Sequence, residues 1–220
     1  MKLSQYLLLL LFSIYSYSQS PIKYWIDSNG KAIEKEKFLL DWREKDEYSR
    51  WDYKTIDSSR VAKLSNNKYI LLKLNHKTLV AKINLLTNKS LSDSTTFIIE
   101  FKFKDDYCIE DLSNNFTKGK IYERKIFTDE LKKKLEQNKN IIYLCFFENG
   151  IKLKNSISNN EYFFLDSEDF LRQNIFIKPA LCGSFLISKP NGETLVRNGE
   201  FSSDNILEFL IPNNWKLMFN

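Results

Sequence analysis

Histidine and recognisable catalytic signatures are what this sequence has least of. His76 is the only histidine among its 220 residues. A zinc site or a histidine-based triad would therefore depend on this one imidazole, and its neighbours offer no ligand spacing. The GxSxG, HExxH and P-loop patterns are absent as well. We expect no metal and no cofactor, and we interpret His76 as a surface residue.

Long apolar runs are missing after the first twenty residues, so the sequence predicts no membrane span beyond them. The chain begins with a positive residue, Lys2, an apolar run at 6–14 and small polar residues up to Ser18. This pattern is typical of a bacterial secretory leader, 1–18, that is cut before Gln19. Its apolar core is shorter than the ~20 residues of a spanning helix, and no cysteine lies near the cut to carry a lipid anchor. We therefore expect a periplasmic or secreted protein.

A strong charge of one sign is also lacking. The net charge is +5, from 33 basic and 28 acidic residues. The lysine-rich stretches 118–125 and 132–134 are interpreted as solvated faces of a loop and a helix, whereas nucleic-acid binding requires a focused basic stripe. With 43% hydrophobic and 15% aromatic residues, the chain can form one domain with additions and a sizeable core. We expect no nucleic-acid partner, and a protein partner in the cell envelope is left open.

Cysteine is scarce, with three in the whole chain. All three follow the leader, so they enter a compartment that permits disulfides, and an odd count leaves at least one thiol free. Cys145 lies in the apolar run 141–147, which is typical of a strand buried on both faces, and it is the best candidate for an inert thiol. Cys108 and Cys182 are left as the pair to consider.

The clearest predicted strand lies just before Cys108. Apolar residues from Phe97 to Phe103 alternate with charged ones at the period of two that a pleated strand imposes. The charged face carries Glu100 and Lys102. One face of this strand should therefore belong to the core, while the other meets solvent or a polar neighbour.

Periodicity, caps and turn residues predict the remaining elements. Helices are expected at 33–47, at 75–88, from Thr128 past Leu135, at 166–174 and at 203–210. Further strands are expected at 24–26, 60–64, 68–74, 184–188 and 194–197. We expect 60–64 and 68–74 to form a hairpin and the polar stretch 48–60 to be a loop over the core. Trp215, in the C-terminal tail, is expected to dock on the core.

From about residue 94, the order of these elements resembles the thioredoxin-like fold: strand, cysteine, helix, buried strand, helix, hairpin and closing helix. The stretch 178–210 carries the resemblance best, with an apolar strand, a PNG turn, a second strand and the final helix. The resemblance implies an α/β fold over 94–220, a central mixed sheet flanked by helices. Residues 19–93 would then be an N-terminal extension of strand, helix and hairpin that packs on this core.

Two positions depart from the family's pattern. The family's catalytic pair is two cysteines separated by two residues, whereas Asp111 stands here in the place of the second, after Cys108. The segment before 184–188, where the family has a cis-proline, holds Cys182 and Gly183. These two places are neighbours in that fold. The resemblance therefore implies that Cys108 and Cys182 lie within the ~4.4–6.8 Å between α-carbons that a disulfide requires.

Three functional hypotheses are open. In the first, the chain is an exported, non-enzymatic thioredoxin-like protein in which Cys108 and Cys182 form a structural disulfide and the surface serves binding. In the second, it is a thiol–disulfide oxidoreductase with Cys108 as the attacking thiolate at a helix start and Cys182 as the resolving thiol. The four acidic residues at 105–111 argue against the second, because negative charge disfavours a thiolate. In the third, it is another secreted α/β binding or inhibitor module.

Other candidate sites have weaker patterns. The adjacent acidic pairs at 105–106, 110–111 and 168–169 are interpreted as turn and helix-start residues, because neighbouring side chains diverge in regular structure. The aromatic residues within 48–53 are either a carbohydrate- or peptide-binding surface or buried packing, and general experience of aromatic side chains favours packing.

Overall fold

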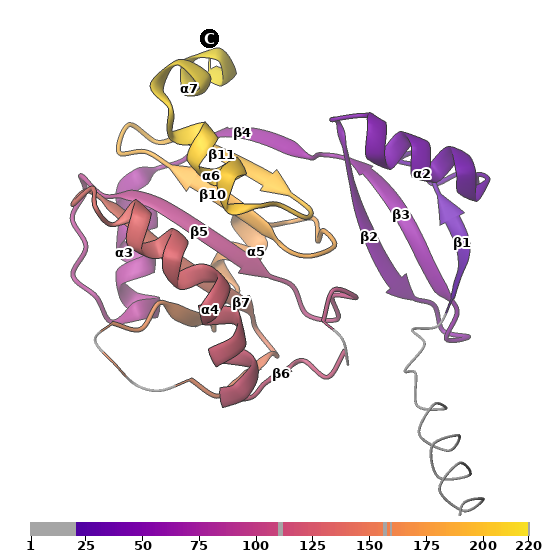
Figure 1. Ribbon diagram of the computed structural model, residues 1–220, viewed down its shortest axis with the longest axis horizontal. Helices are drawn as coiled ribbons and strands as arrows, with labels where there is room; N and C mark the ends of the chain where they lie inside the picture. The colour runs from indigo at the N-terminus through magenta and orange to yellow at the C-terminus, as the bar shows by residue number, and fades with distance from the viewer. Residues whose placement is uncertain (1–20, 110–111, 156–157, 159, 220) are drawn as a thin grey trace, which may run out of the picture.

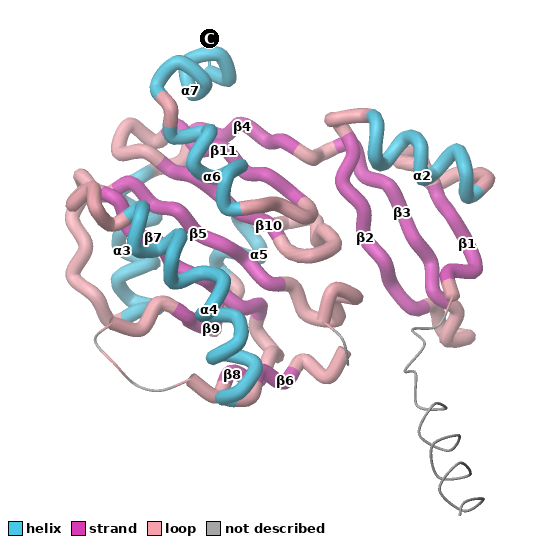
Figure 2. The backbone as a smooth tube through the Cα atoms, in the orientation of Figure 1, coloured by secondary structure: helices cyan, strands magenta, loops and turns pink. Residues whose placement is uncertain are grey.

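The computed structural model describes residues 21–109, 112–155, 158 and 160–219. It has two parts: a three-stranded sheet with one helix, and a larger body around a six-stranded sheet (Figure 1). A two-stranded sheet of β6 (Asn115–Phe116) and β8 (Lys152–Leu153) lies at the lower edge of the larger body in Figure 2. The expected leader, with its cleavage site after Ser18, lies outside the described residues.

The smaller sheet has the strand order β1-β3-β2. Its elements are β1 (Ile22–Ile26), α2 (Lys35–Glu44), β2 (Tyr48–Lys54) and β3 (Arg60–Asn66). β3 lies in the middle, parallel to β1 and antiparallel to β2. α2 covers one face of this sheet, where Phe38, Ala62 and Leu64 form a small apolar cluster. We call these elements the N-terminal part.

The expectation of a loop over 48–60 is wrong for its first half, because β2 pairs with β3 along its whole length. The residues that β2 buries are polar, namely Ser49, Arg50 and Asp52, so the strand lacks the apolar alternation by which strands are recognised. Asp52 accepts hydrogen bonds from Arg50 Nε and Arg60 Nη2, each at 2.6 Å. Burial of these charges is tolerated because they are paired and hydrogen-bonded.

The larger sheet is mixed and has the order β4-β11-β10-β5-β7-β9. Its strands are β4 (Tyr69–Lys73), β5 (Thr96–Lys102), β7 (Ile141–Glu148), β9 (Phe163–Asp166), β10 (Ser184–Ser188) and β11 (Glu193–Asn198). β5, β7 and β9 are parallel, whereas β10, β11 and β4 alternate in direction. β7 is buried on both faces from Tyr143 to Phe147, as its apolar run predicts.

Helices cover both faces of this sheet. They are α3 (His76–Thr87), α4 (Lys118–Leu135), α5 (Phe170–Asn174) and α6 (Ser203–Leu210), and α7 (Pro212–Phe219) follows them. α4 and α6 lie in front of the sheet in Figure 1, and α3 and α5 lie behind it. The predicted α/β class, a central mixed sheet flanked by helices, is thereby confirmed.

The two faces of β5 differ as the sequence predicts, but both are buried. On the apolar face, Phe101 stacks on Phe176, with ring centroids 4.6 Å apart. On the charged face, Glu100 is only 2% exposed and accepts a hydrogen bond from Arg124 of α4. The expected core face is confirmed, and the other face meets a polar neighbour instead of solvent.

The predicted hairpin of 60–64 and 68–74 is wrong. β3 belongs to the smaller sheet and β4 to the edge of the larger one, so the chain crosses from one part to the other between them. Backbone carbonyls join the two parts at this crossing: Asn198 Nδ2 donates to Asn67 O at 2.6 Å, and Asn198 N–H donates to Lys68 O at 2.8 Å. The Asn67 side chain, which suits a turn, is buried and accepts the Ser49 hydroxyl at 2.5 Å. A hairpin was predicted because polar residues at a turn and polar residues in a connection between two sheets cannot be told apart in a sequence.

α4 begins earlier than predicted. Its N-cap is Thr117, whose hydroxyl accepts the backbone N–H of Lys120. Thr128, expected as the cap, lies inside the helix and its hydroxyl is 2.8 Å from that of Tyr162. The first half of α4 was missed because its apolar residues face solvent and blur the helical pattern; Tyr122, Ile126 and Phe127 are 69%, 59% and 76% exposed.

The C-terminal tail docks as predicted. Trp215 of α7 is 3% exposed, and its Nε1 donates to Glu193 Oε2 of β11 at 2.9 Å. Lys189 Nζ lies 4.0 Å from the centroid of the Trp215 ring. Across the residues described here, no helix combines the length and the apolar character that crossing a membrane requires.

Candidate functional site

Cys108 and Cys182 form a disulfide that joins two distant segments. Their α-carbons are 5.0 Å apart, and 74 positions separate them in the sequence. Cys108 lies in a turn after β5, and Cys182 lies in the segment before β10. Cys108 is exposed, whereas Cys182 is half-buried. The expected pairing is confirmed, with a spacing within the range that disulfides allow.

Gly183 brings the Cys182 segment close to β5. Its φ is +92°, and a Cβ at this position would stand 2.7 Å from the carbonyl oxygen of Phe101. Only glycine can take this conformation without a clash. Cys182 itself has a φ of +69°, which residues with a side chain rarely adopt. The described residues contain no cis peptide bond, so the family's cis-proline has no counterpart among them.

Asp106 links the two cysteine segments through one carboxylate. Its Oδ1 accepts the N–H of Cys108 at 2.9 Å and the N–H of Cys182 at 3.1 Å. The side chain is 2% exposed, and burial raises the pKa of this carboxyl group. The bond to Cys108 is a local turn of the kind that aspartate favours. The hydrogen bond to Cys182 forms because the fold places that distant segment beside Asp106. No sequence pattern near Asp106 predicts it.

A buried charge network extends from the disulfide to α4. Lys102 Nζ donates to Cys182 O at 3.1 Å and lies 3.6 Å from Glu100 Oε2. Glu100 also accepts hydrogen bonds from Arg124 Nη2 at 2.7 Å and from the Tyr143 hydroxyl at 2.5 Å. Burial alone would raise the pKa of Glu100, but the charges of Lys102 and Arg124 hold it below its usual value. Burial lowers the pKa of Lys102, whose hydrogen bond to Cys182 O connects this network to the Cys182 segment.

Cys145 lies beside this network and takes no part in the disulfide. It is fully buried in β7 and has a free thiol. Burial, and after it the nearby carboxylate of Glu100, raises the pKa of Cys145 to about 12. A thiol with such a pKa is protonated at neutral pH and unreactive. The interpretation of Cys145 as a buried, inert thiol is confirmed.

Cys108 does not lie at a helix start. α4 begins at Lys118, after its cap at Thr117. The positive end of a helix dipole acts over about the first turn of the helix, and Cys108 does not belong to that turn. The placement of Cys108 at a helix start, part of the oxidoreductase hypothesis, is wrong. Glu110 and Asp111, the latter in the place of a second catalytic cysteine, lie outside the described residues.

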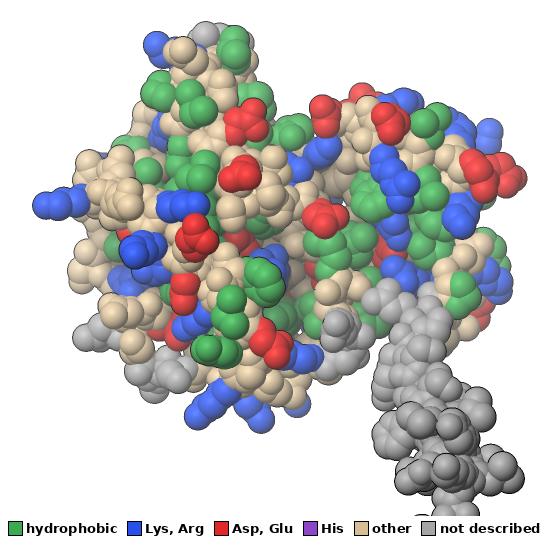
Figure 3. Space-filling view, in the orientation of Figure 1, with side chains coloured by type: hydrophobic (Ala, Val, Ile, Leu, Met, Phe, Trp, Pro, Cys, Tyr) green, Lys and Arg blue, Asp and Glu red, His purple; other side chains and the backbone are tan. Residues whose placement is uncertain are grey.

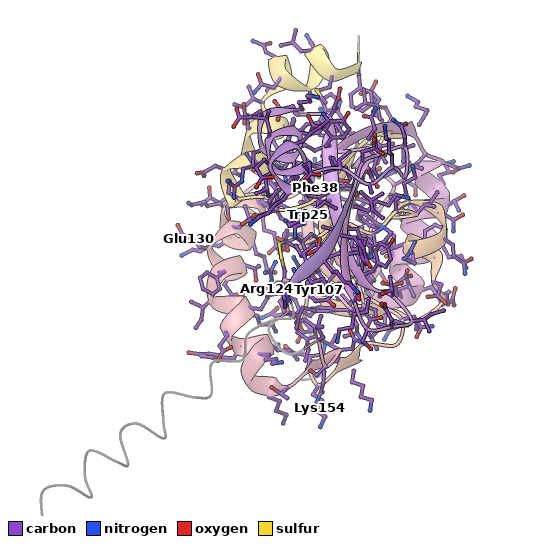
Figure 4. The ribbon with its side chains drawn as sticks, turned by 90° about the vertical axis from the view of Figure 1, so that its right-hand side faces the viewer. Trp25, Phe38, Tyr107, Arg124, Glu130 and Lys154 are labelled. Atoms are coloured by element: carbon purple, nitrogen blue, oxygen red, sulfur yellow. A yellow bond between two sulfur atoms is a disulfide. The ribbon has the colours of Figure 1, made fainter. Side chains whose placement is uncertain are left out.

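The N-terminal part reaches the disulfide segment. The backbone N–H of Leu181 donates to the carbonyl oxygen of Arg50 in β2 at 2.7 Å. The Arg50 guanidinium lies over the rings of Trp25 and Phe38, at 5.7 and 5.6 Å from their centroids. Figure 4 shows these two rings together, with the disulfide as a yellow bond below them. The residue before Cys182 is thus anchored to the smaller sheet.

The topology around the disulfide decides the fold. Apart from the short strands β6 and β8 and the edge strand β9, the elements follow the order β5, α4, β7, α5, β10, β11 and α6. β5 and β7 are parallel neighbours joined through α4, β10 is antiparallel to β5, and β11 is antiparallel to β10. The chain has a thioredoxin-like fold. In this thioredoxin-like core, the turn after the first strand and the segment before the hairpin meet, and each carries one cysteine of the pair.

No protein-family model matches the sequence, and no curated protein matches it. Similar solved structures are the exposed lipoprotein thioredoxin Etrx1 of Streptococcus pneumoniae, the N-terminal domain of PilB from Neisseria gonorrhoeae, and a secreted Mycobacterium tuberculosis disulfide oxidoreductase homologous to DsbE of E. coli. Each is 11% identical to this chain. The alignments cover 74%, 59% and 51% of this chain and 98%, 82% and 78% of theirs, with TM-scores of 0.38, 0.35 and 0.30.

His76 is not the surface residue that the sequence predicts. It is 7% exposed and lies in the first turn of α3, with its ring 5.6 Å from that of Phe97. Burial lowers its pKa. The prediction failed because the packing of α3 on the sheet decides whether a residue in its first turn is buried or exposed, and the sequence near His76 does not show that packing. Within the described ranges, no group of three or more His, Cys, Asp or Glu residues is arranged to hold a metal ion.

The aromatic residues of β2 line two different cavities, and one of them, Trp51, also packs against the core. Trp51 packs edge-on against Phe103, with ring centroids 6.0 Å apart. Trp51 and Tyr53 also line a cavity of about 360 Å³ together with Tyr107. Tyr48 lines a separate cavity, on the side of Cys182. Packing, the favoured interpretation, therefore holds for Trp51.

Proposed function

We propose that this chain is an exported thioredoxin-like protein in which the Cys108–Cys182 disulfide is structural and the surface serves binding instead of thiol exchange. The shared carboxylate of Asp106 is the observation that carries the proposal. Thiol exchange needs a stabilised thiolate, and hydrogen-bond donors at the sulfur supply that stabilisation. Here the N–H groups of both cysteines already have an acceptor, and that acceptor is an acid, whose negative charge would oppose a thiolate beside it.

The position of the disulfide supports a structural role. It closes a loop of 74 positions, for which the chain-entropy model gives a stabilisation of roughly 4–5 kcal/mol. It also fixes the segment on which the N-terminal part rests, through the Leu181 to Arg50 hydrogen bond. Export fits this role, because a disulfide of this kind persists only in an oxidising compartment. A protein of the cell envelope is the kind of partner we propose for such a binding role.

One observation favours the alternative function, a thiol–disulfide oxidoreductase. Cys108 is exposed, so its sulfur can meet another protein's disulfide or thiol. In that function Cys108 would attack and Cys182, 5.0 Å away between α-carbons, would resolve the mixed disulfide. The two functions differ in how readily the disulfide is reduced and in whether the reduced protein turns over a substrate.

A redox titration separates these two functions. The mature protein is equilibrated in thiol buffers of graded potential, quenched, alkylated and mapped by mass spectrometry. We expect the Cys108–Cys182 peptide to stay linked at the glutathione poise of about −220 to −260 mV and to open only below about −300 mV. We also expect no catalysis of insulin disulfide reduction. Reduction at higher potentials together with turnover would overturn the structural role.

Removing the disulfide tests the same proposal through stability. We expect the C108S/C182S variant to lose up to about 4–5 kcal/mol of unfolding free energy, measured in urea. C145S is the matched control, since it removes a sulfur that takes no part in the bond. The proposal predicts that C145S retains the native disulfide. It also predicts that Cys145 of the native wild type is alkylated only after unfolding. A double variant as stable as the wild type would contradict the structural role.

A further inference from the structure

A cavity of about 370 Å³ lies where the N-terminal part faces the end of β11, next to Cys182. Its size is within the range of sites for small organic ligands. The residues that matter are two aromatic ones, three basic ones and one acidic one: Trp42, Tyr48, Arg43, Lys68, Arg197 and Glu200. Figure 3 shows the two parts of the molecule meeting along a seam, with basic and acidic side chains near its upper end.

Positive charge prevails in this cavity. Four of the residues that line it are basic, Arg43, Arg50, Lys68 and Arg197, and one is acidic, Glu200. Arg50 is paired with Asp52, with Nε 2.6 Å from Oδ1. Arg43 and Arg197 form no ion pair with a residue that the structure describes. The cavity therefore attracts an anion.

Arg197 adds a guanidinium group to the wall of this cavity. The side chain is 8% exposed, and its Nη1 donates to the carbonyl oxygens of Gly199 and Glu200. Its Nε is buried and has no hydrogen-bond partner within the described part of the chain. Because that nitrogen is closed to solvent, Arg197 contributes positive charge to the cavity and no free donor.

One basic residue of the cavity, Lys68, already binds a carboxylate of the chain itself. Lys68 Nζ donates to Asp46 Oδ1 at 2.8 Å, although the Asp46 side chain is 92% exposed. This hydrogen bond, the charge of Lys68 and, more weakly, the charge of Arg197 hold the pKa of Asp46 below its usual value. A ligand carboxylate that enters the cavity would compete with Asp46 for the same ammonium group.

We propose that this cavity binds a carboxylate attached to an apolar, aromatic body. The carboxylate accepts hydrogen bonds from Lys68 and Arg43, which are charge-assisted and therefore strong, and the charge of Arg197 favours it further. The apolar body lies against Trp42 and Tyr48. The inference rests on the binding role proposed above and names its ligand chemistry. Such a carboxylate belongs either to a free acid or to an acidic side chain of a peptide.

The test is a titration of the oxidised, disulfide-bonded protein at pH 7, followed by NMR shifts of backbone amides and tryptophan indoles. 3-Phenylpropanoate is compared with its neutral amide, 3-phenylpropanamide. We expect saturable shifts at Trp42 and Gly199 with the acid, and at least about fivefold weaker binding of the amide. Acetyl-Phe-Glu-amide, compared with acetyl-Phe-Gln-amide, is the peptide probe. If the Glu peptide binds more tightly than 3-phenylpropanoate, the carboxylate belongs to a peptide. If 3-phenylpropanoate binds more tightly, the carboxylate belongs to a free acid.

Substitutions place the ligand in the cavity. Lys68→Gln and Arg43→Gln should each weaken binding of 3-phenylpropanoate by about two- to fivefold. Asp46→Asn should strengthen it, because the competing carboxylate is gone. Lys73→Gln is the matched control: this lysine is exposed on β4 and does not line the cavity, so binding should be unchanged.

Equal binding of acid and amide, no saturable shifts with any probe, or weaker binding in Asp46→Asn would overturn the proposal. Thiol exchange has no part in this titration. If no ligand binds, the structural role of the disulfide is unaffected. If the redox titration shows that the disulfide is catalytic, the ligand titration still tests the cavity independently.

Discussion

Among the described residues, the N-terminal part has a small apolar cluster of Phe38, Ala62 and Leu64 with half-buried residues packed on it, whereas the cluster around the six-stranded sheet is large and rich in phenylalanine. What the smaller sheet buries instead is charge. Asp52 is fully buried between Arg50 and Arg60, within a sheet of three strands. The larger sheet also buries charge, at Glu100, but surrounds it with an extensive apolar core.

This difference indicates how the two parts depend on each other. A small apolar cluster supplies little stability by itself. The N-terminal part is therefore expected to rely on its ion pairs and on the hydrogen bonds that join it to the thioredoxin-like core, such as Leu181 to Arg50 and Asn198 to Lys68. Regions with few apolar contacts open locally before the whole protein unfolds. We expect the N-terminal part to be such a region.

The largest effect should come from truncating the aromatic core. Phe101→Ala is expected to lower the global free energy of unfolding by about 3–5 kcal/mol, because it leaves a cavity between β5 and Phe176. Phe38→Ala should instead act mainly on the N-terminal part. Native-state hydrogen exchange measures this, with faster exchange in α2 and β1 and little change in β5 and β7. Equal acceleration in all four elements would show that the two parts unfold as one unit.

The buried carboxylate of the smaller sheet should come next. Asp52→Asn leaves Arg50 and Arg60 without their shared counter-charge, which is expected to cost about 3 kcal/mol in urea unfolding. Asp57→Asn is the control in the same part: Asp57 is exposed, its pair with Lys23 is 3.7 Å long, and asparagine keeps an oxygen that accepts the turn hydrogen bonds from Thr55 and Ser59, so the loss should be much smaller. A similar loss in both variants would mean that ion pairs do not hold this sheet together.

The dependence of stability on pH should reveal Asp106, at the junction of the two parts. Burial raises its pKa above the ordinary value of 3.8, so the folded protein binds this proton more tightly than the unfolded chain. Its contribution is fully present below pH 3.8 and is lost as pH rises through the folded pKa. Relative to Asp106→Asn, the wild type should therefore lose stability between acidic and neutral pH, in urea titrations at each pH. A constant difference between the two would contradict this.

The smallest expected difference in unfolding free energy between the two parts comes from removing helix caps. Thr117→Ala removes the side-chain cap of α4 and should cost about 1 kcal/mol in thermal or urea unfolding. In the N-terminal part, the cap residue of α2 is Glu34, whose side chain makes no capping hydrogen bond. Glu34→Ala should therefore have little effect. The reverse order of these two variants would show that the N-terminal part depends more on local helix signals than its contacts indicate.

Local patterns were enough to predict the core of the fold. The alternation in β5, the apolar run of β7, the turn between β10 and β11 and the capped helix α6 each lie within a few residues, and each is read from spacing alone. Their order along the chain resembles the thioredoxin-like fold, and this resemblance implied the topology that the structure shows. The pairing of Cys108 with Cys182 follows from that topology.

The tertiary structure alone decided which polar residues are buried and what they contact. Nothing near Glu100 predicts that Arg124 will lie over it, and nothing near Asp106 predicts that Cys182 will donate to it. β2 was missed because its buried side chains are charged, and His76 was misplaced because a helix position is buried only when a neighbour covers it. Periodicity records the local conformation of the chain, whereas burial of a charge depends on a partner that folding brings from far away in the sequence.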